Sequence, residues 1–139
     1  MTKARAVVLG IVVLGGPLLL AGCGGGGARD DPQATRDLQA IGLAYHSYND
    51  ASQRGPGKPE DLSPYLEADN KAAYDALKSG RYVFIWNVRL LEAQPTSETV
   101  IAYEKDVPTK GGPVLYADTT VKNLTAEEFK SAKLAKPKS

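Results

Sequence analysis

The sequence predicts an α+β fold, with an N-terminal helix packed on a small antiparallel sheet, from three observations. Apolar side chains recur at spacings of three and four residues between Leu38 and Tyr48, which is the pattern of one helix face. From residue 81 to residue 90, large apolar side chains take every second position, as in a strand. Three further runs of strand length follow, and their short connections favour an antiparallel meander.

The chain begins with the ordered parts of a secretory leader. Lys3 and Arg5 make its start basic, and residues 6–20 are apolar apart from glycines and Pro17. That run is short for a membrane span, which needs about 20 residues, and a proline interrupts it. We therefore predict that residues 1–22 are a signal peptide, with cleavage between Gly22 and Cys23.

The end of the leader, Leu20-Ala21-Gly22-Cys23, resembles the lipobox of bacterial envelope lipoproteins. In that family a diacylglycerol is attached to the cysteine thiol, and a peptidase cuts just before this residue. The resemblance implies that Cys23 is acylated, that it anchors the protein in a lipid bilayer, and that the protein faces the periplasm or the cell surface. The alternative is that Cys23, which is the one cysteine in the chain, is an ordinary small residue of a membrane span.

Residues 23–31 form a glycine-rich tether in this prediction. About eight such residues have an r.m.s. reach of only ~16 Å, which would hold the domain close to the lipid headgroups. Without Lys3 and Arg5 the mature chain has 15 of the 17 Lys and Arg residues, against 16 Asp and Glu. This near-neutral charge gives no steering towards nucleic acid, so we predict no nucleic-acid partner.

The folded domain is predicted to span residues 32–135 and to open with a helix. Asp31 supplies a capping carboxylate and Pro32 the first helical residue. The inward face contains Leu38, Ile41, Tyr45 and Tyr48, and Gly42 would allow close approach to a sheet. We expect the helix to end near residues 49–50. His46 is predicted to be a surface or boundary residue on this helix, because the chain has no second histidine to share catalysis or a metal.

Two short helices are predicted next, each with an apolar side. The first brings in Leu62, Tyr65 and Leu66, and the second Ala73, Tyr74 and Leu77. The strand of residues 81–90 then places five side chains on one face: Tyr82, Phe84, Trp86, Val88 and Leu90. Core packing is the expected role of this face, and binding of sugars or bases is the alternative.

Three strands and a helix complete the predicted domain. The strands are residues 99–104, 114–117 and 120–124, with Pro113 before the second and Asp118-Thr119 turning into the third. Residues 125–128 form a capping box that opens a last helix, with Phe129 and Leu134 on its buried side. We expect the chain from Lys133 to be frayed, with residues 136–139 as a basic tail.

Residues 37–48, 77–86 and 114–118 resemble the opening helix and the sheet of pseudopilin-like bacterial surface proteins. The resemblance covers most of residues 32–134 and implies a helix packed on an antiparallel sheet. Members of that family usually begin with a prepilin leader, whose apolar helix stays attached and drives assembly; here the lipobox stands in its place. Members also often have a histidine before the third strand and Asp-Gly at its end, where this chain has Pro108 and Asp118-Thr119.

These patterns predict a non-enzymatic lipoprotein of the cell envelope with a structural or docking role, whose partner is an envelope or secretion-system protein. The alternative is a module that binds a cation or small ligand, as the resemblance to secretion pseudopilins allows, with Asp106 and Asp118 as candidate oxygen ligands. An enzyme is not expected, because the chain lacks a second histidine and its cysteine would be lipidated. We predict no cofactor, and the Glu127-Glu128 pair belongs to the helix cap.

Overall fold

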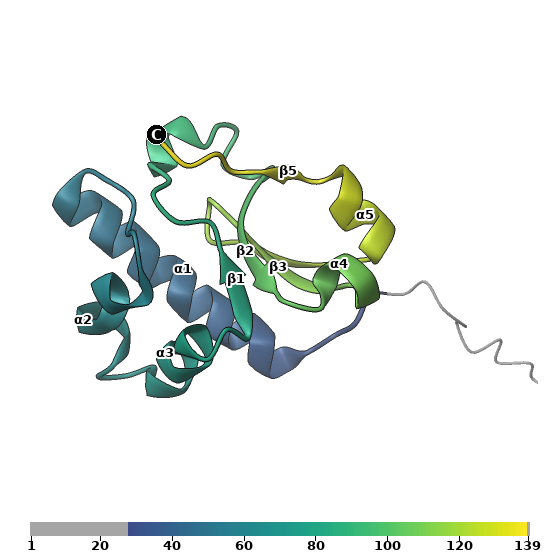
Figure 1. Cartoon of the computed structure of the whole chain (residues 1–139), viewed down its shortest axis with the longest axis horizontal. Helices are drawn as coiled ribbons and strands as arrows, with labels where there is room; N and C mark the ends of the chain where they lie inside the picture. The colour runs from purple at the N-terminus through teal and green to yellow at the C-terminus, as the bar shows by residue number, and fades with distance from the viewer. Residues whose placement is uncertain (1–27, 139) are drawn as a thin grey trace, which may run out of the picture.

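Helix α1, Pro32–Ser52, lies along one face of a five-stranded sheet in this computed structural model (Figure 1). The structure describes residues 28–138, so the predicted signal peptide, Cys23 and the glycine run lie outside the described residues. The order of elements is α1, η1 (Pro59–Leu62), α2 (Ser63–Leu66), α3 (Lys71–Lys78), β1 (Tyr82–Phe84), η2 (Leu90–Glu92), β2 (Thr99–Glu104), α4 (Val107–Lys110), β3 (Gly112–Tyr116), β4 (Val121–Leu124), α5 (Ala126–Ser131) and β5 (Lys133–Leu134). The predicted α+β class, with the long helix packed against β3, is confirmed.

The sheet has the order β1-β2-β3-β4 with antiparallel neighbours. Strand β5 is added in parallel to β2. Strand β1 pairs with residues 102–104 of β2 and β5 with residues 99–100, so both occupy the edge of β2 that β3 leaves open. The register between β2 and β3 shifts between Val100 and Ala102. Near the same point, the other edge of β2 changes its partner from β5 to β1.

Helix α1 begins as predicted, because the Asp31 carboxylate accepts the Ala34 N–H at 3.0 Å and Pro32 follows it. Ile41 is fully buried in the core between this helix and the sheet. At Gly42 an added Cβ would lie 3.0 Å from a Leu115 methyl carbon, which confirms the predicted close approach to the sheet. The helix ends at Ser52, slightly beyond the predicted end, with Gln53 in the left-handed conformation.

Aromatic rings join α1 to the segment that follows α3. The Tyr45 and Phe84 rings stack with centroids 5.3 Å apart, and Phe84 and Trp86 stack at 4.9 Å. The Tyr45 hydroxyl also donates to the Val88 carbonyl at 2.8 Å. Core packing of this face is therefore confirmed, since all of its predicted members are buried except Trp86, which is half-buried.

The predicted strand of residues 81–90 was too long, because pairing ends at Phe84 and Ile85. The edge of β2 beyond this point pairs with β5, so no partner remains for a longer β1. The Asn87 N–H donates instead to the Pro56 carbonyl at 2.8 Å, and Asn87 takes a positive φ of 59°. The alternating side chains are buried by contact with α1 and the loop after it rather than by strand pairing.

Three predictions near the ends of short elements were wrong. Tyr65 was expected to point inward, but it is 39% exposed. Leu134 was expected on the last helix, but α5 ends at Ser131 and Leu134 is a β5 residue that is 41% exposed. The chain from Lys133 is not frayed, because β5 pairs with β2 and the Ala135 N–H donates to the Val100 carbonyl at 2.8 Å.

Candidate functional site

The predicted lipidation site at Gly22 and Cys23 lies outside the described residues, which begin with Ala28. Within residues 28–138, no helix is both long and apolar enough for a membrane span.

The candidate cation ligands Asp106 and Asp118 are not brought together. Asp106 precedes α4 in the connection that enters β3, and Asp118 lies in the turn that leaves β3. With a rise of about 3.3 Å per residue, a strand of this length separates its two ends by much more than a shared ion allows. The Asp118 carboxylate accepts the Thr120 N–H at 2.9 Å. Among the described residues, no three His, Cys, Asp or Glu side chains are grouped to hold a metal.

His46 lies half-buried at the edge of α1, the boundary position that the sequence predicts. Its Nε2 is 2.7 Å from the Ala117 carbonyl oxygen. A carbonyl only accepts, so this nitrogen carries the proton and the ring ties α1 to the end of β3. His46 also borders an open cleft of about 240 Å³ between α1 and residues 90–96, whose walls include Asn49, Asp50 and Leu91.

The first described residues are held on the domain by charged groups, which we call the N-terminal cluster: Arg29, Asp31, Arg81 and Glu104. Arg81 Nη2 lies 2.9 Å from Asp31 Oδ2, and Arg81 Nε lies 3.5 Å from Glu104 Oε1. Arg29 Nη2 forms an ion pair with Glu104 Oε2. Glu104 is only 7% exposed, so its charge depends on these two arginines rather than on water.

Hydrogen bonding lowers the pKa of Asp31 from its ordinary value. The largest cause is the bond accepted from the Ala34 N–H, and the Arg81 and Arg29 guanidinium groups act in the same direction against desolvation. The charged carboxylate therefore both caps α1 and holds Arg81. This double role ties the start of the helix to β1, which follows directly after Arg81.

A second buried carboxylate, Asp37, lies on α1 six residues after Asp31. It accepts the Tyr82 hydroxyl at 2.6 Å and the Gln33 amide at 2.8 Å. Burial raises the pKa of Tyr82, and the bond to Asp37 raises it further, so the phenol stays protonated and donates. These bonds join α1 to β1 beside the N-terminal cluster.

The other end of the domain contains an open cleft of about 400 Å³, which we call the C-terminal cleft. It lies between β5 and η2, and its walls are formed by Glu92, Ala93, Thr99, Lys133, Leu134, Ala135 and Lys136. Arg89 and Lys138 both contact the Glu92 carboxylate, each at 3.3 Å. The Lys133 ammonium donates to the Gln94 carbonyl.

Sequence reasoning missed both charged regions. Arg29 and Glu104 are 75 positions apart, and Arg81 lies in a third segment, so no spacing rule connects them. A local signal existed only for the C-terminal cleft, where four lysines and no carboxylate follow Phe129. That signal was interpreted as a frayed tail, since the pairing of β5 with β2 is not visible in local sequence.

Several polar side chains that could take part in chemistry are instead hydrogen-bonded to the backbone. The Ser52 hydroxyl donates to the Tyr48 carbonyl at 2.7 Å, and His46 likewise contacts a backbone carbonyl. The capping-box prediction is confirmed at Thr125 and Glu128, which bond each other's backbone N–H groups at α5.

Comparisons of this chain with protein-family models, curated proteins and solved structures found no significant match.

Proposed function

We propose that this chain is a lipid-anchored protein of the bacterial cell envelope, whose domain docks onto another envelope protein without catalysing a reaction. The observation that carries the proposal is the short distance along the chain between anchor and domain. Five residues separate Cys23, at the end of the lipobox-like sequence, from Arg29, which forms an ion pair with the buried Glu104.

This spacing determines how far the domain could move from an acylated Cys23. The six residue-to-residue steps from Cys23 to Arg29 span at most about 22 Å when fully extended. Two or more acyl chains hold a protein at a membrane stably, and confinement raises the effective concentration of any partner in the same membrane. A weak docking contact would then suffice for a stable complex, which suits a small domain with open clefts.

The fold supports the same role. A long N-terminal helix on an antiparallel sheet is what the resemblance to pseudopilin-like surface proteins implies. In those proteins the apolar leader helix drives assembly, and here a cleaved leader would leave a lipid in its place. We therefore propose a single anchored module rather than a subunit of a fibre.

The cation-binding alternative has no favourable arrangement among the described residues, because β3 separates Asp106 from Asp118. Calcium should therefore leave the melting temperature of the protein unchanged. A calcium-dependent rise that Asp118→Ala abolishes would restore this alternative.

Two measurements test the anchor and its role. Radiolabelled palmitate should enter the wild-type chain in bacterial cells and should not enter Cys23→Ser. A form secreted without the lipid, starting at Gly24, should fold and yet fail to rescue a strain in which the gene is deleted. Label in Cys23→Ser would contradict the anchor, and full rescue by the unlipidated form would contradict docking at the membrane.

A further inference from the structure

We propose that the C-terminal cleft is the docking surface of this domain and that it binds an acidic, extended segment of a partner protein along the outer edge of β5. The inference rests on the docking role proposed above and adds the place and the chemistry of the partner. Charge, backbone geometry and position each support it.

The cleft has an excess of positive charge. Lys133, Lys136 and Glu92 line it, and the Glu92 carboxylate is already shared by Arg89 and Lys138. Glu98 is exposed on the adjacent loop, which leaves two net positive charges in this region. Within residues 28–138, Lys133 and Lys136 form no ion pair. Carboxylates of a partner could therefore pair with both lysines without breaking an existing ion pair.

The backbone of β5 offers a free edge beside these lysines. Alternate residues of a strand direct their N–H and C=O groups to opposite edges. The Ala135 N–H bonds to Val100 of β2, so the backbone groups of Leu134 point to the outer edge. No other strand of the described domain pairs with β5. An extended peptide can add to such an edge through main-chain hydrogen bonds.

Apolar surface is available at the same place. Leu134 lines the cleft and is 41% exposed. An extended segment in which acidic and apolar side chains alternate would place its carboxylates on the face of Lys133 and its apolar groups on the face of Leu134. This argues for a polypeptide rather than a simple polyanion.

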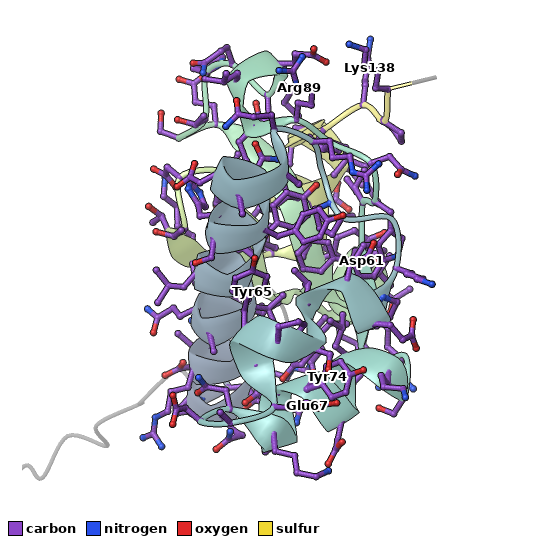
Figure 2. The ribbon with its side chains drawn as sticks, turned by 90° about the vertical axis from the view of Figure 1, so that its left-hand side faces the viewer. Asp61, Tyr65, Glu67, Tyr74, Arg89 and Lys138 are labelled. Carbon is purple, nitrogen blue, oxygen red and sulfur yellow. The ribbon has the colours of Figure 1, made fainter. Side chains whose placement is uncertain are left out.

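The position of the cleft keeps it accessible in an anchored protein. Figure 1 shows the start of the described chain beside α4 and its C-terminal end beside η2, at opposite ends of the domain. Figure 2 shows Arg89 and Lys138 together at the same end of the molecule. When the N-terminal cluster holds the anchor end near the bilayer, the cleft faces away from it, where a partner protein can reach it.

The test measures binding of a fluorescent peptide of four alternating glutamate-valine pairs to the lipidated mature chain in detergent, by fluorescence anisotropy. Lys133→Gln combined with Lys136→Gln should weaken binding by roughly five- to tenfold, because two exposed charge-assisted contacts are lost. The matched control is Lys105→Gln combined with Lys110→Gln, which removes the same charge near α4 and should change affinity less than about twofold. Both lysines of the control are exposed.

Further probes separate strand addition from general attraction. A peptide in which the central valines are replaced by proline should bind at least about fivefold more weakly, because proline cannot donate to a strand edge. Lys136→Gln alone, which leaves the Lys133–Gln94 contact intact, should weaken binding by an intermediate factor. Cys23→Ser should bind the peptide as the wild type does, so a failed anchor would be distinguishable from a failed docking surface.

Four outcomes would overturn the proposal: equal weakening by the two double variants, equal binding of the proline peptide, tighter binding of inorganic polyphosphate than of the peptide, or binding of anionic vesicles through the same lysines. Vesicles containing one third phosphatidylglycerol test whether the cleft binds lipid headgroups. If they bind a Cys23→Ser chain and the Lys133/Lys136 double variant abolishes that binding, the cleft recognises lipid headgroups instead of a protein.

Discussion

At the N-terminal cluster two arginines and two carboxylates neutralise one another, whereas at the C-terminal cleft Arg89 and Lys138 share Glu92 and two further lysines, Lys133 and Lys136, form no ion pair within the described residues. Glu104 is almost completely buried, but the Lys138 side chain is 59% exposed. Charges that are buried and paired hold parts of one chain together, because separating them leaves an unpaired charge in the apolar protein interior. Exposed cations without carboxylates add little stability and remain available to a partner.

The largest expected effect is that of Glu104→Gln at the N-terminal cluster. The change leaves Arg29 and Arg81 without their shared carboxylate and should lower the free energy of unfolding by about 2–3 kcal/mol. Urea denaturation of both proteins measures it. The matched control is Glu127→Gln, which removes an exposed carboxylate paired with Lys130 and should change stability by less than about 0.5 kcal/mol. Equal effects of the two changes would remove the distinction between the two regions.

A smaller loss of folding stability is expected from Tyr82→Phe, which tests the hydrogen bonds beside the N-terminal cluster. Removing the hydroxyl leaves one oxygen of the buried Asp37 without its 2.6 Å bond and should cost about 1–2 kcal/mol. Thermal denaturation at neutral pH provides the measurement. Tyr65→Phe is the control, because Tyr65 is 39% exposed. This variant should have a melting temperature within about a degree of the wild type. A melting temperature for Tyr82→Phe that matches this control would mean that Asp37 is satisfied by other groups.

Acid should weaken the N-terminal cluster in a predictable direction. The pKa of Asp31 is lowered by its bond from Ala34 and by Arg81, so the unfolded chain binds a proton at higher pH than the folded one. Its contribution is therefore complete above the unfolded pKa of about 3.9 and is lost as the pH falls through the lower folded pKa. The stability difference between wild type and Asp31→Asn should shrink between about pH 5 and pH 2, measured by urea denaturation. Asparagine can still cap the helix, so a difference that does not change with pH would show that only the cap matters.

The smallest expected effect on stability is that of Lys136→Gln in the C-terminal cleft. This lysine forms no ion pair within the described part of the chain, so the free energy of unfolding should change by less than about 0.5 kcal/mol. The same variant should weaken binding of the acidic peptide, so that stability and binding separate at this position. A loss of stability comparable to that of Glu104→Gln would instead assign a structural role to the lysine.

Local chemistry was sufficient to predict several elements. Asp31-Pro32 marked the start of α1, the run of residues 99–104 matched β2, and Thr125 with Glu128 marked the cap of α5. Each of these signals acts within one turn or one strand, where side-chain periodicity and capping bonds depend on neighbours in sequence. The boundary position of His46 was predicted on other grounds, because the chain has no second histidine.

Long-range pairing was needed for the remaining features. The length of β1 depends on how much of the β2 edge is already taken by β5, which arrives from the C-terminus. The N-terminal cluster joins Arg29, Arg81 and Glu104 from three distant segments, and the C-terminal cleft exists because β5 returns beside η2. The sequence by itself determines which side chains are apolar or charged, but the strand order of the sheet determines which of them come into contact. The reason is that backbone pairing between distant segments leaves no periodic pattern in either segment.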